Sequence, residues 1–163
     1  MTQCKENILA SILSEPVTFM NLVDRVNCSS QTVNKYVCEL ENSKQITHKK
    51  GKFKIFYNPV LELEKIEFYE LMLNNSIKLI VSILLHSNDL SQSEIVEKIL
   101  KSRPTVSRTL SVLIQNDIIQ IKYHAPFKTY SIKNKSKIIS WIKQTNLKLI
   151  DNMTDNTVAM LSY

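Results

Sequence analysis

Two arginines in the segment SRPTVSRTL, residues 102–110, stand at a spacing that can place both on the exposed side of one helix. A guanidinium group can donate two hydrogen bonds to O6 and N7 of a guanine, and the hydroxyls of neighbouring Ser and Thr residues suit phosphate oxygens. Ser102 is a typical helix N-cap, and Pro104 would lie in the first turn, where its missing N–H costs nothing. The segment therefore predicts either a helix that contacts nucleic acid or an ordinary surface helix with a solvated polar side.

This segment has a counterpart 73 residues earlier in the chain. Ser102 and the pair Thr105-Val106 align with Ser29 and the pair Thr32-Val33. At the same offset, apolar positions coincide along most of the first half, for example Ile8 with Val81, Leu22 with Ile95, Val37 with Leu110 and Leu40 with Leu113. Such a regular correspondence predicts two copies of one folded unit.

Each copy is predicted to contain three short helices. Apolar spacings of three and four residues indicate helices, and polar clusters mark their ends. In the second copy we expect the first helix at about 76–86 and the second from Ser91, with Glu94 as its capping-box partner. The third helix is expected to begin after Ser102. A single glycine and four prolines in 163 residues argue against an all-β fold, which needs many tight turns.

A β-hairpin is predicted to follow the helices of each copy. The strands are expected at 118–123 and 128–133 around the turn HAPF, and at 45–50 and 54–58 around GKF. The predicted organisation is a first domain at 1–60, a connecting helix or linker at 61–75, a second domain at 76–134, and a C-terminal helix and tail at 135–163.

The order of three helices and a hairpin resembles a winged helix-turn-helix. Residues 93–120, SEIVEKILKSRPTVSRTLSVLIQNDIIQ, resemble the helix-turn-helix of MarR-like and ArsR-like transcriptional regulators, and KGKFKIFYNP at 50–59 resembles their basic wing. The resemblance covers about 5–59 and 77–133 and implies a mainly α fold with small β-hairpin wings (α+β), in tandem winged helix-turn-helix domains. The family usually has a glycine in the turn before the third helix, where this chain has Asn27-Cys28 and Leu100-Lys101. It also usually has one unit per chain.

The resemblance implies that the third helices enter the major groove of double-stranded DNA and that the basic wings lie on phosphates. It also suggests an archaeal or viral source. The implied DNA-binding residues are Ser30, Gln31, Thr32, Asn34, Lys35, Lys49, Lys50, Lys52, Lys54, Arg103, Thr105, Ser107, Arg108, Ser111, Lys122, His124 and Lys128.

Charge is segregated along the chain in a way that favours an anionic partner. The formal net charge is +6, and residues 44–54 contain five lysines and no acid. Residues 101–137 contain eight Lys or Arg and only Asp117 as an acid, whereas 61–71 contain four Glu and one Lys. If four to eight of these cations meet phosphates, affinity for DNA should fall steeply with salt, with a logarithmic slope of about 0.9 per contact.

Neither catalysis nor a cofactor is indicated. The three histidines are scattered, and no cluster of titratable groups suggests a catalytic or metal site. Cys4, Cys28 and Cys38 are odd in number and form no CxxC, so we expect packing cysteines in a reducing cytoplasm, without a disulfide framework. Redox sensing is a less favoured alternative. The longest apolar run is too short to cross a bilayer, and we expect a cytoplasmic, nucleoid-associated protein without a signal peptide.

The C-terminal helix, expected at about 135–150, has two alternative roles. Its apolar residues Ile138, Trp141, Ile142 and Leu149 could form a homodimer interface or could pack on their own domain. Two other functions remain open for the chain as a whole, a protein-interaction scaffold built from tandem winged helices and a plasmid-type replication initiator.

Overall fold

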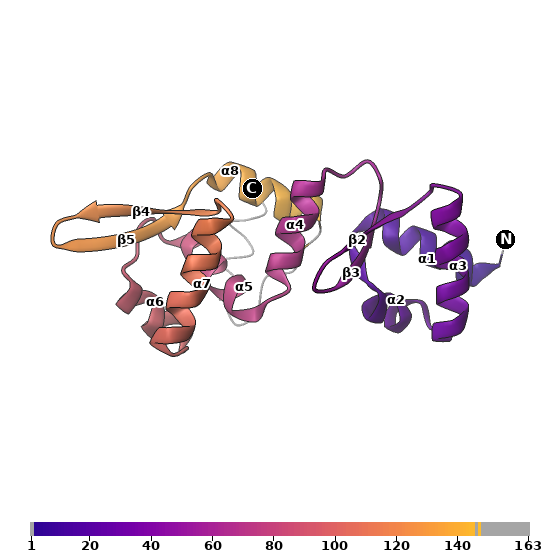
Figure 1. Ribbon diagram of the computed structural model, residues 1–163, viewed down its shortest axis with the longest axis horizontal. Coiled ribbons are helices and arrows are strands. Elements are labelled where there is room, and N and C mark those ends of the chain that lie inside the picture. Colours follow the sequence, from indigo (N-terminus) through magenta and orange to yellow (C-terminus); the bar gives the residue numbers. More distant parts are fainter. Residues whose placement is uncertain (1, 146, 148–163) are drawn as a thin grey trace. The chain divides into compact units, whose positions relative to one another are not determined.

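The computed structural model describes residues 2–145 and 147 of the chain. The chain divides into two compact units, residues 2–70 with 143–145, and residues 71–142 with 147. Each unit contains three consecutive helices and a small antiparallel sheet, and a further helix follows each sheet (Figure 1). The predicted fold class, mainly α with β-hairpin wings in tandem winged helix-turn-helix domains, is confirmed.

The first unit has its core between three helices, α1 (Gln3–Ser14), α2 (Phe19–Val26) and α3 (Ser30–Asn42). Their apolar residues recur every three or four positions and so form one stripe on each helix. The stripes meet in a cluster of fully buried side chains that includes Ile8, Ile12, Leu22, Val33 and Leu40.

A three-stranded sheet closes this core. It contains β1 (Val17–Thr18), β2 (Thr47–Lys50) and β3 (Lys54–Tyr57) in the order β1-β3-β2. Phe56 in the central strand pairs with Val17 on one side and His48 on the other, and its side chain is buried in the helical core. The chain continues into α4 (Leu63–Met72), the predicted connecting helix.

The second unit repeats this plan with α5 (Asn75–His86), α6 (Gln92–Ile99), α7 (Arg103–Gln115), β4 (Ile119–His124) and β5 (Phe127–Ile132), followed by α8 (Lys135–Gln144). Its third strand is reduced to a bridge between Leu90 and Tyr130. The predicted capping box is present: the Glu94 N–H donates to Ser91 Oγ, and the Ser91 N–H donates to a Glu94 carboxylate oxygen. Ser102 caps α7, as predicted.

The repeat of 73 residues extends to backbone conformation. Helices α2 and α3 coincide with α6 and α7 when moved by this offset, and so do their N-cap residues. Four residues other than glycine have positive φ in the described part of the chain, and they form two pairs at the same offset, Asn27 with Leu100 and Lys44 with Asp117. The two units therefore share their backbone turns as well as their apolar pattern.

The turn of the second hairpin is tighter than predicted, while its strands have the predicted length of six residues. Its strands have six residues each, against four in the first hairpin, and only Ala125 and Pro126 remain between them. The expected four-residue turn HAPF is reduced to two residues, because His124 and Phe127 pair directly across the hairpin.

Among the described residues, no single helix is long and apolar enough to span a bilayer, and only α4 and α5, as a bent pair, meet both conditions together.

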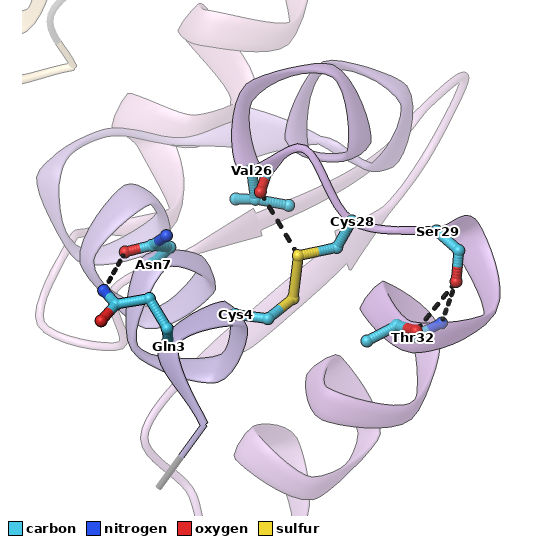
Figure 2. Close-up of a disulfide and its surroundings, with 7 residues drawn as sticks. All are labelled: Gln3, Cys4, Asn7, Val26, Cys28, Ser29 and Thr32. Atoms are coloured by element: carbon cyan, nitrogen blue, oxygen red, sulfur yellow. Dashed lines mark hydrogen bonds between the residues drawn. A yellow bond between two sulfur atoms is a disulfide. The ribbon is translucent and has the colours of Figure 1, made fainter.

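The prediction that the cysteines form no disulfide is wrong. Cys4 and Cys28, 24 residues apart, are bonded to each other, and Cys38 is an exposed free thiol rather than a packing residue. Figure 2 shows the bond between the first turn of α1 and the segment that leads into α3. Packing of α1 against α2 and α3 brings the two cysteines together, and their spacing in the sequence does not reveal it.

Reducing this disulfide should destabilise the first unit. A crosslink that closes a loop of this length contributes about 3 kcal/mol by restricting the unfolded chain. We expect dithiothreitol, or the substitution Cys4→Ser, to lower the urea midpoint. Cys38→Ser is the matched control and should leave the midpoint unchanged, whereas equal midpoints for oxidised and reduced protein would contradict a stabilising role for the bond.

Candidate nucleic-acid interface

The third helix of each unit begins with the same cap. The Thr32 N–H donates to Ser29 Oγ at 3.2 Å, and the Thr105 N–H donates to Ser102 Oγ at 3.3 Å. In both caps the Ser and Thr hydroxyls are also hydrogen-bonded at 2.8 Å. The hydroxyls of Thr32 and Thr105, predicted to contact DNA, are thus already used in fixing the helix start.

The turn before each third helix adopts a left-handed conformation without glycine. Asn27 has φ 53° and Leu100 has φ 55°. Asn tolerates this region, but Leu does so at a steric cost, because its Cβ approaches the following carbonyl oxygen. The Leu100 side chain is 86% exposed, so packing does not offset that cost.

The outer side of α7 carries the predicted base-reading residues. Val106, Leu110 and Leu113 are buried on its inner side, whereas Arg103, Ser107, Arg108 and Ser111 are exposed. The two guanidinium groups make only long hydrogen bonds at the surface, from Arg103 to Ser93 Oγ at 3.2 Å and from Arg108 to the Pro104 carbonyl oxygen at 3.4 Å. Neither arginine has an acidic partner among the described residues, so both can exchange these bonds for contacts to a ligand.

The equivalent side of α3 is exposed as well. Ser30, Gln31, Asn34 and Lys35 occupy the positions of Arg103, Pro104, Ser107 and Arg108, and all four are exposed. Cys38 is equivalent to Ser111 and lies on this same side, which the sequence interpretation missed because free cysteines usually pack inside small domains. The exposed side of α3 therefore carries two amides and that of α7 two guanidinium groups, and these groups occupy different positions of the repeat.

Wing 1, which we define as residues 47–57, contains a cradle for a negative charge that already holds a carboxylate. Glu70 of α4 is 2.7 Å from Lys49 Nζ and accepts a hydrogen bond from the Lys52 N–H at 3.1 Å. A Cβ on Gly51 would lie 2.5 Å from a Glu70 oxygen, so the absence of a side chain there admits the carboxylate. Lys49, a predicted phosphate contact, is ion-paired in this structure, whereas Lys50, Lys52 and Lys54 are exposed without acidic partners in the described part of the chain.

Wing 2, which we define as residues 119–132, also exposes basic residues. Lys128 and His124 are exposed without acidic partners in the described structure, and the Lys128 ammonium lies 5.6 Å from the ring centre of Tyr130. Lys122 is 3.2 Å from Asp89, but this pair is half-exposed and is worth little in water.

Lys5 lies at the start of α1 and is not part of this cationic surface. Its ammonium is 2.8 Å from Glu39 of α3, and this hydrogen bond lowers the pKa of the Glu39 carboxyl. The pair joins two helices of the first unit, and it neutralises the Lys5 ammonium, which could otherwise contact a phosphate.

The C-terminal helix exposes fewer of its predicted dimer-interface residues than the sequence suggested. Ile138 and Ile142 in α8 are buried within the chain, which favours packing on the protein itself over the homodimer alternative. Trp141 is half-buried, and the Lys137 ammonium lies 4.5 Å from its ring centre. The fourth predicted residue, Leu149, and the predicted continuation of this helix to about residue 150 lie outside the described residues.

Within the described residues, no group of three or more His, Cys, Asp or Glu side chains could hold a metal ion.

Comparisons with known proteins give structural similarities alone. No protein-family model matches this sequence, and no curated protein matches it. Similar solved structures include reduced HlyU from Vibrio cholerae (TM-score 0.43, 18% identity, 52% of this chain and 90% of that chain). A hypothetical protein from Pyrobaculum spherical virus is also similar (TM-score 0.38, 16% identity, 66% and 68%). So is the mRNA-binding domain of elongation factor SelB from E. coli (TM-score 0.29, 9% identity, 82% and 100%).

At TM-scores below 0.5 these similarities carry no functional information. The winged-helix assignment rests on the order and pairing of this chain's own helices and strands.

Replacing Leu100 by glycine should stabilise the second unit. Glycine removes the left-handed steric cost of about 1–2 kcal/mol and adds a smaller entropic cost in the unfolded chain, for a net gain of roughly 0.5–1 kcal/mol. Leu100→Ala is the matched control, because it deletes the same exposed side chain and keeps the Cβ. Urea unfolding should give a higher midpoint for the glycine variant only; equal midpoints for both variants would contradict backbone strain at this turn.

Proposed function

We propose that this chain binds double-stranded DNA sequence-specifically, with both third helices in major grooves, and acts as a transcriptional regulator. The observation that carries the proposal is the matched exposure of polar residues on α3 and α7, at equivalent positions of two identically capped helices. A third helix in this fold reads bases with such residues. The regulatory role follows from the resemblance to MarR-like and ArsR-like proteins.

The chemistry of the two helices suggests different base preferences. The exposed guanidinium groups of Arg103 and Arg108 on α7 suit guanine, whereas Gln31 and Asn34 on α3 suit adenine, whose N6 and N7 match a side-chain amide. Each good bidentate contact discriminates by about 1–3 kcal/mol against the wrong base. We therefore infer a site with two dissimilar halves rather than a perfect palindrome.

The wings supply the phosphate contacts of this proposal. Lys50, Lys52 and Lys54 in wing 1 and Lys128 in wing 2 are exposed, and in the described structure no acid competes for them. Lys35 and Arg108 lie on the third helices and can add to this anchoring.

Removing both arginines of α7 should weaken DNA binding and relax its sequence preference. For Arg103→Ala with Arg108→Ala we expect a loss of about 2–6 kcal/mol on the preferred site if both read bases, and a smaller loss on random duplex. Fluorescence anisotropy with a labelled duplex, selected from random sequences, measures both affinities across a salt series.

Lys143→Ala is the matched control, because it removes an exposed cation from α8, a helix that contributes no residue to the proposed surface. It should change affinity only slightly. Absence of duplex binding by the unaltered protein at low salt would overturn the proposal and would favour the protein-interaction scaffold. Protection of a replication origin rather than a promoter would identify the initiator alternative.

Removing the Glu70 carboxylate from the cradle of wing 1 should strengthen DNA binding. Glu70→Gln removes the carboxylate that holds Lys49, so the ammonium and the Lys52 N–H become available to a phosphate. We expect a higher affinity and a salt slope steeper by about 0.9, the value for one added phosphate contact.

Glu67→Gln removes the same charge from an exposed position on the same helix and measures the general effect of one acid fewer. Equal effects of the two substitutions in the anisotropy series would show that Glu70 does not compete with phosphate at this cradle.

A further inference from the structure

Wing 2 ends in an apolar tip that the phosphate contacts do not explain. Tyr123 is 76% exposed and Phe127 is 69% exposed, and Pro126 lies in the turn between their strands. Burying an exposed aromatic side chain against a partner is favourable, and large exposed apolar groups often mark an interaction site.

The hairpin geometry carries the two rings beyond the core of the second unit. Tyr123 pairs with Lys128, and His124 pairs with Phe127, so the rings lie on opposite faces of the two-stranded ribbon. Nearer the helices, Ile119, Tyr130 and Ile132 are buried. Wing 1 stops earlier, because at the offset of 73 Tyr123 corresponds to Lys50. Its turn holds one aromatic side chain, Phe53, which is 41% exposed, so wing 2 differs in its longer strands and its two more exposed rings.

The charge around the tip indicates what covers it. Residues 118–150 contain no Asp or Glu. Lys122 and Lys128 flank the two rings, and Lys122 also forms a half-exposed pair with Asp89 at 3.2 Å. A partner must therefore combine negative charge with flat apolar surfaces. Duplex DNA provides both, because its phosphates border a groove from which apolar side chains can enter between base pairs.

We propose that the tip of wing 2 is a base-contacting wedge: Phe127 or Tyr123 enters the minor groove, partly unstacks one base step and bends the duplex. The inference rests on the proposed DNA binding and goes beyond it, because phosphate contacts and major-groove reading need neither unstacking nor a bend. Side chains inserted in this way kink DNA by about 20–90°. The lysines beside the rings contact the phosphates on either side of the minor groove, while one aromatic ring lies between two base pairs.

A duplex with 2-aminopurine in its central steps and a dye at each end tests the wedge with the full-length protein. We expect binding to raise 2-aminopurine fluorescence at one step and to increase energy transfer between the ends. Phe127→Ala and Tyr123→Ala together should abolish both signals and lower the affinity roughly 5- to 150-fold, the range for one base–aromatic stack. Phe127→Tyr keeps a ring and, with Tyr123 intact, should retain both signals.

Val60→Ala is the matched control, because it shortens another strongly exposed apolar side chain outside the wing. All the altered side chains are exposed, and circular dichroism melting verifies that each variant folds. Anisotropy in the same cuvette separates the two proposals: binding without unstacking or bending overturns the wedge alone, as do unchanged signals in the double variant. No binding at low salt overturns DNA binding itself.

Discussion

Burial of one apolar side of each third helix is the constraint on which both units depend. Val33, Val37 and Leu40 in α3, and Val106, Leu110 and Leu113 in α7, are almost completely buried. Each such side chain contributes about 1.5–3 kcal/mol when it is removed from water. Because these residues must face the other helices, the remaining side of each third helix has to face outward. Its polar residues are presented as a consequence of apolar packing.

The same backbone in two copies carries two different surfaces. The caps and left-handed turns coincide, yet the exposed side of α3 carries amides and that of α7 carries guanidinium groups. The wings differ in the same way: wing 1 is short and holds Glu70 in its turn, whereas wing 2 extends past the core and ends in exposed aromatic rings. A duplicated scaffold has thus acquired two distinct sets of contacts, which suits a ligand whose two halves differ.

Local features of the structure could be predicted well from the sequence. Helix starts at Ser91 and Ser102, the capping box at Glu94 and the presence of both hairpins depend on residues within a few positions of one another. Interactions between distant segments could not. The disulfide joins Cys4 to Cys28, and Glu70 reaches wing 1 from the following helix. The turn of wing 2 was expected to be wider than it is, because the direct pairing of His124 with Phe127 was not foreseen.

The sequence by itself determined the repeat, the inner and outer sides of the third helices and the segregation of charge. These follow from periodicity and composition, which each short segment carries independently of its neighbours. Only the tertiary structure decided which charges and thiols are free: Lys49 and Cys28 are occupied, whereas Arg103, Arg108 and Cys38 are exposed. The physical reason is that availability depends on which residues packing brings within a few ångströms, and chain position does not encode that distance.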